Sequence, residues 1–289
     1  MSSRVTRNGN FAHKQFDRRT LDELPLVIQR SRLLSESGLR TPVAISNQDG
    51  NETVSPWIEG QTGSVYLIRL RSAGGLSRWS DLSEADQGRL LAPLVQLHNT
   101  SVINLELHPL DIWRRITPRL ASDSGISVDG RSAEIDDMYR HLRDQQVAIE
   151  PLHHEHGVPV HGDYHVNQII VARQDGEPWI LDLDDMALGF PEIDLGNFIA
   201  NLATNSDLLI DSVMEDYQTL KGMLCPIYVS LGGRVPDTRL IDFYAAVSLL
   251  RRFLKFFETG RCDPDPDEIL RACRVLTCQL TIEGSTTDD

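Results

Sequence analysis

The sequence is poor in basic residues and contains no apolar run of membrane-spanning length. Its 289 residues include 28 Lys and Arg against 42 Asp and Glu, which gives a formal net charge of -14 at pH 7. A surface of that sign repels nucleic-acid phosphates, so we expect no nucleic-acid partner. The charged N-terminus also lacks the apolar core of a signal peptide, so we expect a cytoplasmic protein with no membrane partner.

Cysteine is scarce, and its spacing is unlike that of a metal site. The chain has four cysteines, none of which forms a CxxC pair or a zinc-like spacing with histidine: Cys225, Cys262, Cys273 and Cys278. The chain also lacks internal repeats and low-complexity tracts. A hydrophobic content of 40% over this length is sufficient for two modest lobes around a cleft.

The most informative stretch runs from Pro159 to Leu195. Two apolar runs, at residues 169–171 and 179–181, flank the turn signal Asp175-Gly176. β-Branched and aromatic residues on both sides of an Asp-Gly turn predict a β-hairpin.

Four polar residues lie at the ends of this hairpin. Asp163 and Gln168 precede its first strand, while Asp182 and Asp184 follow its second. We therefore expect all four side chains at the same end of the hairpin. Carboxylate and amide oxygens suit Mg²⁺, and a further carboxylate can orient an attacking hydroxyl in phosphoryl transfer. A turn or capping role is the alternative for any single aspartate.

The same residues resemble a known catalytic segment. The matching pieces are His161-Gly162-Asp163-Tyr164-His165, Gln168, Leu181-Asp182-Leu183-Asp184 and Asp194-Leu195. They are similar to the HGDxHxxN, hydrophobic-D-x-D/E and later Asp-Leu signals of the aminoglycoside phosphotransferase and choline kinase-like superfamily, which is related to protein kinases. The resemblance implies an α+β, two-lobed protein-kinase-like fold, with a small, shortened β-rich N-terminal lobe and a large, mainly helical C-terminal lobe.

The resemblance also implies roles for individual residues. Asp163 would be the catalytic base, and His161 would hold the backbone of the catalytic loop. Asp182 would be the principal Mg²⁺ ligand, and Asp194 would anchor the loop.

The metal-binding residues depart from the family pattern at one position. Gln168 stands where the family has a ligating Asn, and its amide oxygen is the same group on a longer stem. Asn167 would serve only if the loop shifted by one residue. Of Asp184 and Asp185, one is expected to support the metal and the other to cap a turn. His165 is expected to be a packed or hydrogen-bonded loop residue.

The resemblance places the nucleotide against two elements of the small lobe. Asn8-Gly9-Asn10 predicts a hairpin whose second arm, residues 11–16, carries Lys14. Lys14 would contact the α- and β-phosphates of ATP, as against being an ordinary exposed strand lysine. Residues 53–60 resemble the last strand and the hinge, with the adenine edge near Ser55, Trp57 and Ile58, as against a plain strand-to-loop connection.

Two family features are missing from the small lobe. A helix predicted over residues 24–37 should carry a Glu that pairs with Lys14, but the expected position falls near Val27. Glu23 would substitute only if the chain turns toward Lys14, and Glu36 is too close to the helix end. No glycine-rich phosphate loop is readable in residues 1–7.

The rest of the chain predicts the helical lobe. The apolar periodicity indicates helices over residues 83–98, 132–150, 195–203, 208–231, 238–258 and 268–280. His153, His154 and His156 read as a polar surface loop, and His98 as a buried, hydrogen-bonded histidine. We therefore divide the chain into a small lobe with its hinge at residues 1–60, a helical lobe at 61–281 and a disordered tail at 282–289.

These features predict an ATP- and Mg²⁺-dependent phosphotransferase that acts on a hydroxyl of a small molecule, such as an aminoglycoside-like antibiotic, a sugar or an amino alcohol. A basic acceptor would meet acids of the helical lobe, although each of these also reads as part of a solvated helix face: Asp211, Glu215, Asp216 and Glu258. The alternative is a catalytically weak kinase-like binding module, or a peptide Ser/Thr kinase that acts with a protein or peptide partner in a biosynthetic complex.

Overall fold

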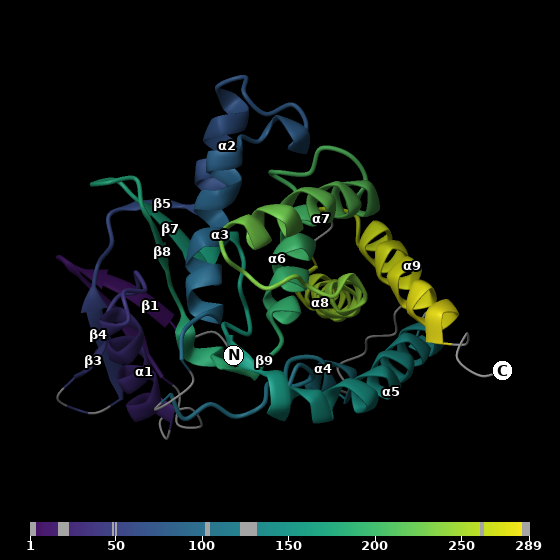
Figure 1. The fold of residues 1–289 in the computed structure, drawn as a ribbon, viewed down its shortest axis with the longest axis horizontal. Helices are drawn as coiled ribbons and strands as arrows, with labels where there is room; N and C mark the ends of the chain where they lie inside the picture. Colours follow the sequence, from purple (N-terminus) through teal and green to yellow (C-terminus); the bar gives the residue numbers. More distant parts are fainter. Residues whose placement is uncertain are drawn as a thin grey trace.

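The computed structural model describes residues 4–16, 23–47, 49, 51–101, 105–121, 132–260 and 263–284. A small antiparallel sheet and helix α1 lie at one side of the molecule, and helices α6 to α9 lie at the other (Figure 1). Helix α3 runs between these two parts. The protein is thus a mixed α/β fold with small sheets near the N-terminus and a larger helical part, as the sequence predicts.

The N-terminal sheet has four strands in the order β1-β2-β4-β3, and all neighbours are antiparallel. Its strands are β1 (Arg4–Asn8), β2 (Phe11–Gln15), β3 (Ile45–Ser46) and β4 (Glu52–Pro56). The hairpin predicted around Gly9 is confirmed: Asn8 pairs with Phe11 and Val5 with Lys14. Phe11 is 50% exposed, so the outer part of this sheet is open to solvent.

Helix α1 (Leu24–Glu36) packs beside this sheet and confirms the predicted helix. Pro25 stands in its first turn, where a missing N–H costs nothing. The buried positions of α1 recur at helical spacing: Leu24, Val27, Arg30, Ser31 and Leu34. The apolar residues at its start form a separate small core with Phe16, the residue that follows β2.

The hairpin predicted around Gly176 is formed by β7 (Ile169–Ala172) and β8 (Pro178–Ile180), which confirms the predicted pairing. A third strand, β5 (Gly60–Thr62), pairs with β7 on its other side. The Gly60 backbone lies against β7 so closely that a Cβ at this position would come within 2.4 Å of the Val171 carbonyl oxygen. The chain after β4 is thereby fastened directly to the hairpin.

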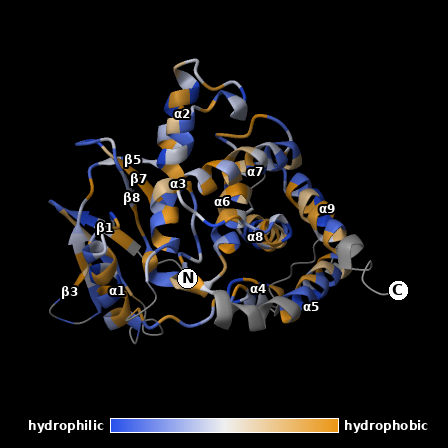
Figure 2. Cartoon of the chain, viewed as in Figure 1, coloured by the Kyte–Doolittle hydropathy of each residue, from blue (hydrophilic) through white to orange (hydrophobic). Residues whose placement is uncertain are grey.

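The helical part surrounds one continuous apolar core. Its main helices are α2 (Gly63–Ser72), α3 (Glu84–His98), α5 (Ser132–His156), α6 (Pro191–Ala203), α7 (Val213–Ser230), α8 (Thr238–Thr259) and α9 (Pro266–Gly284). Every residue of α6 is buried, and this helix is largely orange in Figure 2, whereas β1 is mainly blue. Gly196 lets α6 and α8 meet backbone to backbone, because a Cβ there would lie 2.8 Å from Ala245 N and Ile241 O.

Several boundaries differ from the predictions. Helix α5 continues through His156, so a surface loop at His153, His154 and His156 is wrong. Helix α7 begins at Val213 and not at residue 208. Helix α2, the short helix α4 (Thr117–Ala121) and the two-stranded sheet of β6 (Val158–Val160) and β9 (Ala187–Gly189) were not predicted. Within the described residues, no helix combines the length and apolar character needed to cross a membrane.

Candidate active site

Asp194, in the first turn of α6, binds the backbone of the loop that leads to Asp163. Its carboxylate is fully buried and accepts the backbone N–H groups of His161 at 2.7 Å and Gly162 at 2.9 Å. The ring of His98, itself buried as predicted, lies 3.1 Å from the same carboxylate and 2.8 Å from the hydroxyl of Tyr228. Asp194 is therefore the loop anchor that the resemblance implies.

His161 ties the catalytic loop to the end of the hairpin. Its Nδ1 accepts the backbone N–H of Asp163 at 3.3 Å, which leaves Nε2 as the protonated nitrogen that donates to the Leu181 carbonyl at 2.8 Å. The backbone N–H of Leu181 in turn donates to the carbonyl of Gln168 at 2.8 Å. These bonds hold the residues before Asp182 against the loop that carries Asp163.

Asp163 lies between two arginines. Arg251, on α8, donates to Oδ1 at 2.7 Å, and Arg115 donates to Oδ2. Burial opposes the charge of Asp163, but the two guanidinium groups outweigh it and hold the pKa of this carboxyl well below its usual range. The group is therefore an ionised acceptor, and each of its oxygens keeps a lone pair for the hydroxyl of a substrate.

Lys14 and two aspartates form the other end of the site. The Lys14 ammonium lies between the carboxylates of Asp182 and Asp184, and it is 2.6 Å from Asp184 Oδ2. Burial lowers the pKa of Lys14, but the two carboxylates outweigh this and raise it. Burial raises the pKa of Asp182, but the charge of Lys14 and its hydrogen bond together outweigh burial, so the pKa of Asp182 is lowered overall. For Asp184, burial is the larger influence, and its pKa is raised. Gln168 completes the group by donating to Asp182 Oδ2 at 2.8 Å.

The backbone of Asp182 is in the left-handed region, with φ 60° and ψ 54°. Aspartate tolerates this conformation better than most residues, and it is a feature of functional sites when the surrounding structure imposes it. Here the surrounding bonds of Leu181 impose it and aim the Asp182 carboxylate at Lys14.

The predicted Mg²⁺ ligands fit one cation. Asp182 and Asp184 already converge on a single positive group, the Lys14 ammonium, and a half-turn of the Gln168 amide exchanges its NH₂ for its oxygen. The described residues contain no group of three or more His, Cys, Asp or Glu that could hold a metal by itself. The set therefore matches Mg²⁺ that takes its remaining ligands from phosphates and water.

The contacts of three neighbouring residues, Asn167, His165 and Asp185, show where their side chains lie. Asn167 accepts from Ser64 at 2.6 Å and so points to α2, while Gln168 reaches Asp182. His165 Nδ1 accepts the N–H of Asn167 at 3.2 Å, a loop hydrogen bond as predicted. Asp185 binds Arg114 and Arg115 and faces away from the Lys14 group.

The helix glutamate is absent from the Lys14 site. Val27 is buried against Phe16 and Leu24, so the position where the family places a carboxylate is apolar. Glu23 and Glu36, although both are described, make no ion pair with Lys14. Asp182 and Asp184 neutralise the lysine in its place.

The three residues predicted to meet the adenine edge lie at the end of β4 and beyond it. Ser55 pairs with Ala12 inside the sheet, and the Trp57 N–H donates to the Asn10 carbonyl at 2.8 Å. Within the part of the chain that the structure describes, the backbone of Ile58 has no hydrogen-bond partner. Of these three residues, Ile58 is the one whose N–H and carbonyl both lack a partner in the described part of the chain.

Three of the four acids considered for a basic acceptor, Glu215, Asp216 and Glu258, have partners close by. Asp216 is buried and accepts the N–H groups of Ile210 and Asp211, and Glu215 forms a capping box with Ser212 at the start of α7. Glu258 pairs with Arg119 at 2.9 Å. The contacts of these three carboxylates are thus local ones.

Solved structures of kinases share this fold. A choline/ethanolamine kinase family protein from Mesorhizobium loti is 13% identical over 99% of this chain and 86% of that chain, with a TM-score of 0.58. A choline kinase from Cryptosporidium parvum is 12% identical over 98% and 90%, with a TM-score of 0.61. An aminoglycoside phosphotransferase from Streptomyces rimosus, in complex with ADP and streptomycin, is 13% identical over 84% and 87%, with a TM-score of 0.60.

At these identities the structural similarity establishes the fold alone. No curated protein matches the sequence. The model of the phosphotransferase enzyme family, however, matches residues 3–226, which is more than half of the chain. That range includes both the strand of Lys14 and the whole segment from His161 to Asp194. The chain belongs to the phosphotransferase enzyme family.

Proposed function

We propose that the protein transfers the γ-phosphoryl group of ATP to a hydroxyl of a small molecule and requires Mg²⁺. The observation that carries this proposal is the convergence of Asp163, Gln168 and Asp182 with Lys14 at one end of the β7–β8 hairpin. A binding protein needs no ionised carboxylate on a loop fastened this firmly, whereas phosphoryl transfer depends on positioning and charge neutralisation.

Each residue has a separate task in this proposal. Asp182, Gln168 and Asp184 hold Mg²⁺, which neutralises phosphate charge when bound, and Lys14 turns from its carboxylates to the phosphates. Asp163 orients the acceptor hydroxyl and receives its proton, and His161 keeps Asp163 and Asp182 in register. The new bond joins the acceptor oxygen to the γ-phosphorus, the bond from phosphorus to the bridging oxygen breaks, and ADP leaves.

The relatives support the small-molecule acceptor and the nucleotide. The Streptomyces rimosus structure contains ADP and streptomycin, and other similar structures are a choline kinase and a glucosamine kinase. An aminoglycoside, an amino alcohol and a sugar are thus the acceptors that the family offers. ATP is the donor in our proposal, and Ile58 supplies the backbone groups for adenine.

A second candidate, a weak kinase-like module that binds nucleotide or a partner protein, rests on one observation. Val27 replaces the helix glutamate, so Lys14 has no partner on α1. We favour the enzyme because Asp182 and Asp184 supply that negative charge.

The test is calorimetric titration with ATP, with and without Mg²⁺, together with an assay of ADP release, on the wild type, Asp163→Ala and Asp182→Ala. Asp163→Ala should keep nucleotide binding but lose turnover by about 10³-fold, within the range of about 10²–10⁴ typical of a general base. Asp182→Ala should lose the metal-dependent part of binding. Asp175→Ala is the matched control, because Asp175 is an exposed carboxylate on the same hairpin that contacts Arg40 instead of the site. Near-normal turnover in Asp163→Ala would overturn the assignment.

A further inference from the structure

A small cavity lies beside Asp163. It measures about 50 Å³ and is walled by the segment after Leu110, the catalytic loop at Gly162 and helices α6 and α8. Its charged lining residues are Asp111, Arg114, Arg115, Asp185 and Arg251. Since Arg115 and Arg251 both bind Asp163, a molecule in this cavity is adjacent to the catalytic carboxylate.

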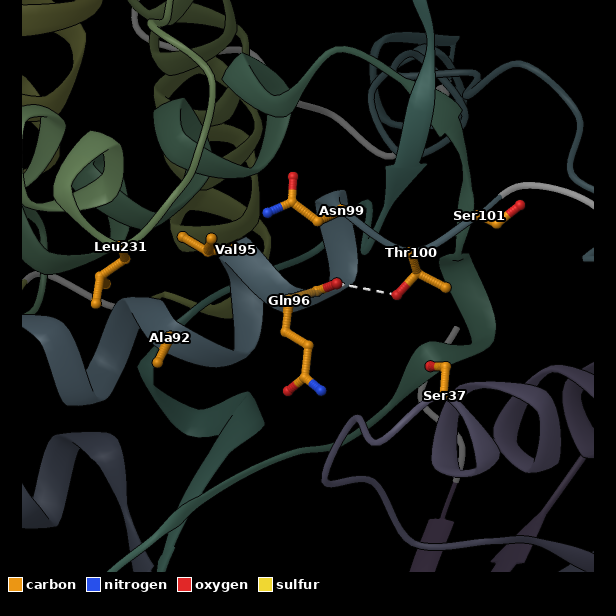
Figure 3. A pocket seen from close by; sticks show the side chains of 8 residues that line it. All are labelled: Ser37, Ala92, Val95, Gln96, Asn99, Thr100, Ser101 and Leu231. Carbon is orange, nitrogen blue, oxygen red and sulfur yellow. Dashed lines mark hydrogen bonds between the residues drawn. The ribbon is translucent and has the colours of Figure 1, made fainter.

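Another cavity, of about 420 Å³, lies between the end of α1 and α3 and has a different character (Figure 3). Its lining includes Ser37, Gln96, Thr100 and Leu231 but no charged side chain, and none of its residues belongs to the candidate active site. A third cavity, of about 660 Å³, lies along α1 and also contains no residue of the candidate active site. Of these three cavities, the small one therefore adjoins the site.

The arginines of the small cavity outnumber the carboxylates that they bind. Arg115 spans Asp163 and Asp185, Arg114 takes the other oxygen of Asp185, and Arg251 takes the other oxygen of Asp163. Asp111, the remaining acid of the lining, accepts the backbone N–H of Trp113 at 3.0 Å. Three guanidinium groups thus share two carboxylates, and each guanidinium has more donors than these bonds use.

Helix α8 carries two further basic residues close to Arg251, which are Arg252 and Lys255. The Nε of Arg252 is buried without a hydrogen-bond partner, and within the described residues this side chain forms no ion pair. Burial and then the positive charge of Arg251 lower the pKa of Arg252 to about 10, and burial followed by both arginines lowers the pKa of Lys255. Glu258, the nearest acid on α8, is held by Arg119. The region is therefore positive within a chain whose net charge is -14.

We propose that the acceptor carries, besides its hydroxyl, an anionic group, a carboxylate or a phosphate, which binds Arg114, Arg115 and Arg251. This inference rests on the proposed phosphotransferase function and names its substrate class. Guanidinium groups bind carboxylates and phosphates in bidentate geometry, and the apolar wall at Ile112, Tyr244 and Val247 suits a short carbon skeleton. A cationic acceptor such as an aminoglycoside or choline would meet like charge here.

Binding of the anion also prepares the base. In the free protein, Arg115 and Arg251 occupy Asp163 and hold its pKa down. An anion that engages Arg115 competes with Asp163 for this guanidinium and so raises the basicity of the carboxylate. The hydroxyl then donates to Asp163, its oxygen bonds to the γ-phosphorus of ATP, ADP leaves, and the proton remains on Asp163 or passes to water.

The test uses three compounds that share a three-carbon diol and differ in charge: D-glycerate, glycerol and 3-aminopropane-1,2-diol. Their binding to the full-length protein is measured by ligand-observed NMR at concentrations up to tens of millimolar. We expect D-glycerate to bind about tenfold more tightly than the neutral and cationic compounds, since about 1.4 kcal/mol from a charge-assisted bond corresponds to tenfold. Equal or tighter binding of either other compound, or no binding of D-glycerate, would overturn the proposal.

Two variants test whether the preference for D-glycerate arises at the small cavity. Arg114→Gln should weaken D-glycerate binding about tenfold, and Arg114 is 53% exposed, so its loss does not threaten the fold. Arg140→Gln makes the same charge change on the exposed face of α5 and should have no effect. An equal loss in both variants would mean that only the overall charge matters, which contradicts the proposal. Mg²⁺-dependent ATP binding is followed on the same samples: its absence refutes the phosphotransferase, whereas intact ATP binding with a preference for the amine refutes only the anionic acceptor.

Discussion

The two ends of the candidate site are built differently. At the catalytic-loop end, Asp194 and His161 are fully buried, and their bonds run to backbone groups over the large apolar core. At the other end, which would bind the phosphates, Lys14 comes from a sheet whose own core contains only a few residues. This end is held by ion pairs between the side chains of Lys14, Asp182 and Asp184. In the proposed mechanism, the loop backbone of the first end is in place before any substrate arrives, whereas Lys14 at the second end must exchange its carboxylate partners for phosphates.

In the proposed mechanism, the two ends have different tasks, because one orients the acceptor hydroxyl and the other binds the phosphates. In that mechanism the loop of Asp163 orients the hydroxyl, and a displacement that breaks its bonds to Asp194 would leave buried groups unpaired at a cost of about 1–3 kcal/mol per group. The phosphate end has to accept a ligand with several negative charges, so a cation shared between two carboxylates is a suitable arrangement for it.

The largest difference should appear when the same substitution is made at both ends. Asp194→Asn replaces one acceptor oxygen by an NH₂ that faces a backbone donor, and we expect a loss of about 3 kcal/mol in the free energy of unfolding together with loss of activity. Asp184→Asn, in a partly exposed ion pair, should cost less than about 1 kcal/mol. Urea unfolding of both variants measures the contrast, and equal losses would remove the distinction between the two ends.

A second effect, of intermediate size, concerns pH at the catalytic-loop end. Burial lowers the pKa of His165 to about 4, although Asp163 opposes this, whereas an unfolded histidine titrates near about 6.5. Between these values the unfolded chain binds a proton that the folded protein refuses, so stability is complete above pH 6.5 and falls by about 2–3 kcal/mol as the pH falls to 4. Unfolding measured across this range should show a smaller decline in His165→Gln, and an unchanged slope would contradict the assignment.

The smallest effect is expected at Lys14. Lys14→Met leaves Asp182 and Asp184 facing each other and should cost about 1 kcal/mol or less without metal. Mg²⁺ alone should then raise the melting temperature of the variant more than that of the wild type, because the carboxylates no longer have the ammonium. An equal Mg²⁺ response in the two proteins would show that the pair does not converge on one cation.

Local patterns predicted much of the fold. The hairpins around Gly9 and Gly176 follow from turn residues between apolar runs, and helices α1, α3 and α8 follow from apolar spacing with recognisable caps. The start of α7 was misplaced because Asp216 folds back onto the N–H groups of Ile210 and Asp211, which keeps residues 208–212 out of the helix. The capping box of Ser212 and Glu215 is a local signal for the true start of α7, and the apolar spacing alone missed it.

The residues of the candidate site were likewise predictable only in part. Gln168 and Asp182 could be paired in advance because a hairpin brings its two ends together. The arginines on Asp163 could not, since Arg115 and Arg251 are separated from it by 48 and 88 residues and approach it only after the helices pack. Their sequence neighbourhoods, Arg114-Arg115 and Arg251-Arg252, are basic pairs in an acidic chain, and this is the one signal that was available.

Arg30 joins α1 to segments outside the N-terminal sheet. From the buried face of α1 it donates to the carbonyls of Leu105 at 3.0 Å, Glu106 at 2.6 Å and Met186 at 3.3 Å. Protein kinases use displacement of the corresponding helix as an on-off device. Here α1 cannot shift relative to Met186, two residues after Asp184, without depriving a buried guanidinium of the three carbonyls that it binds.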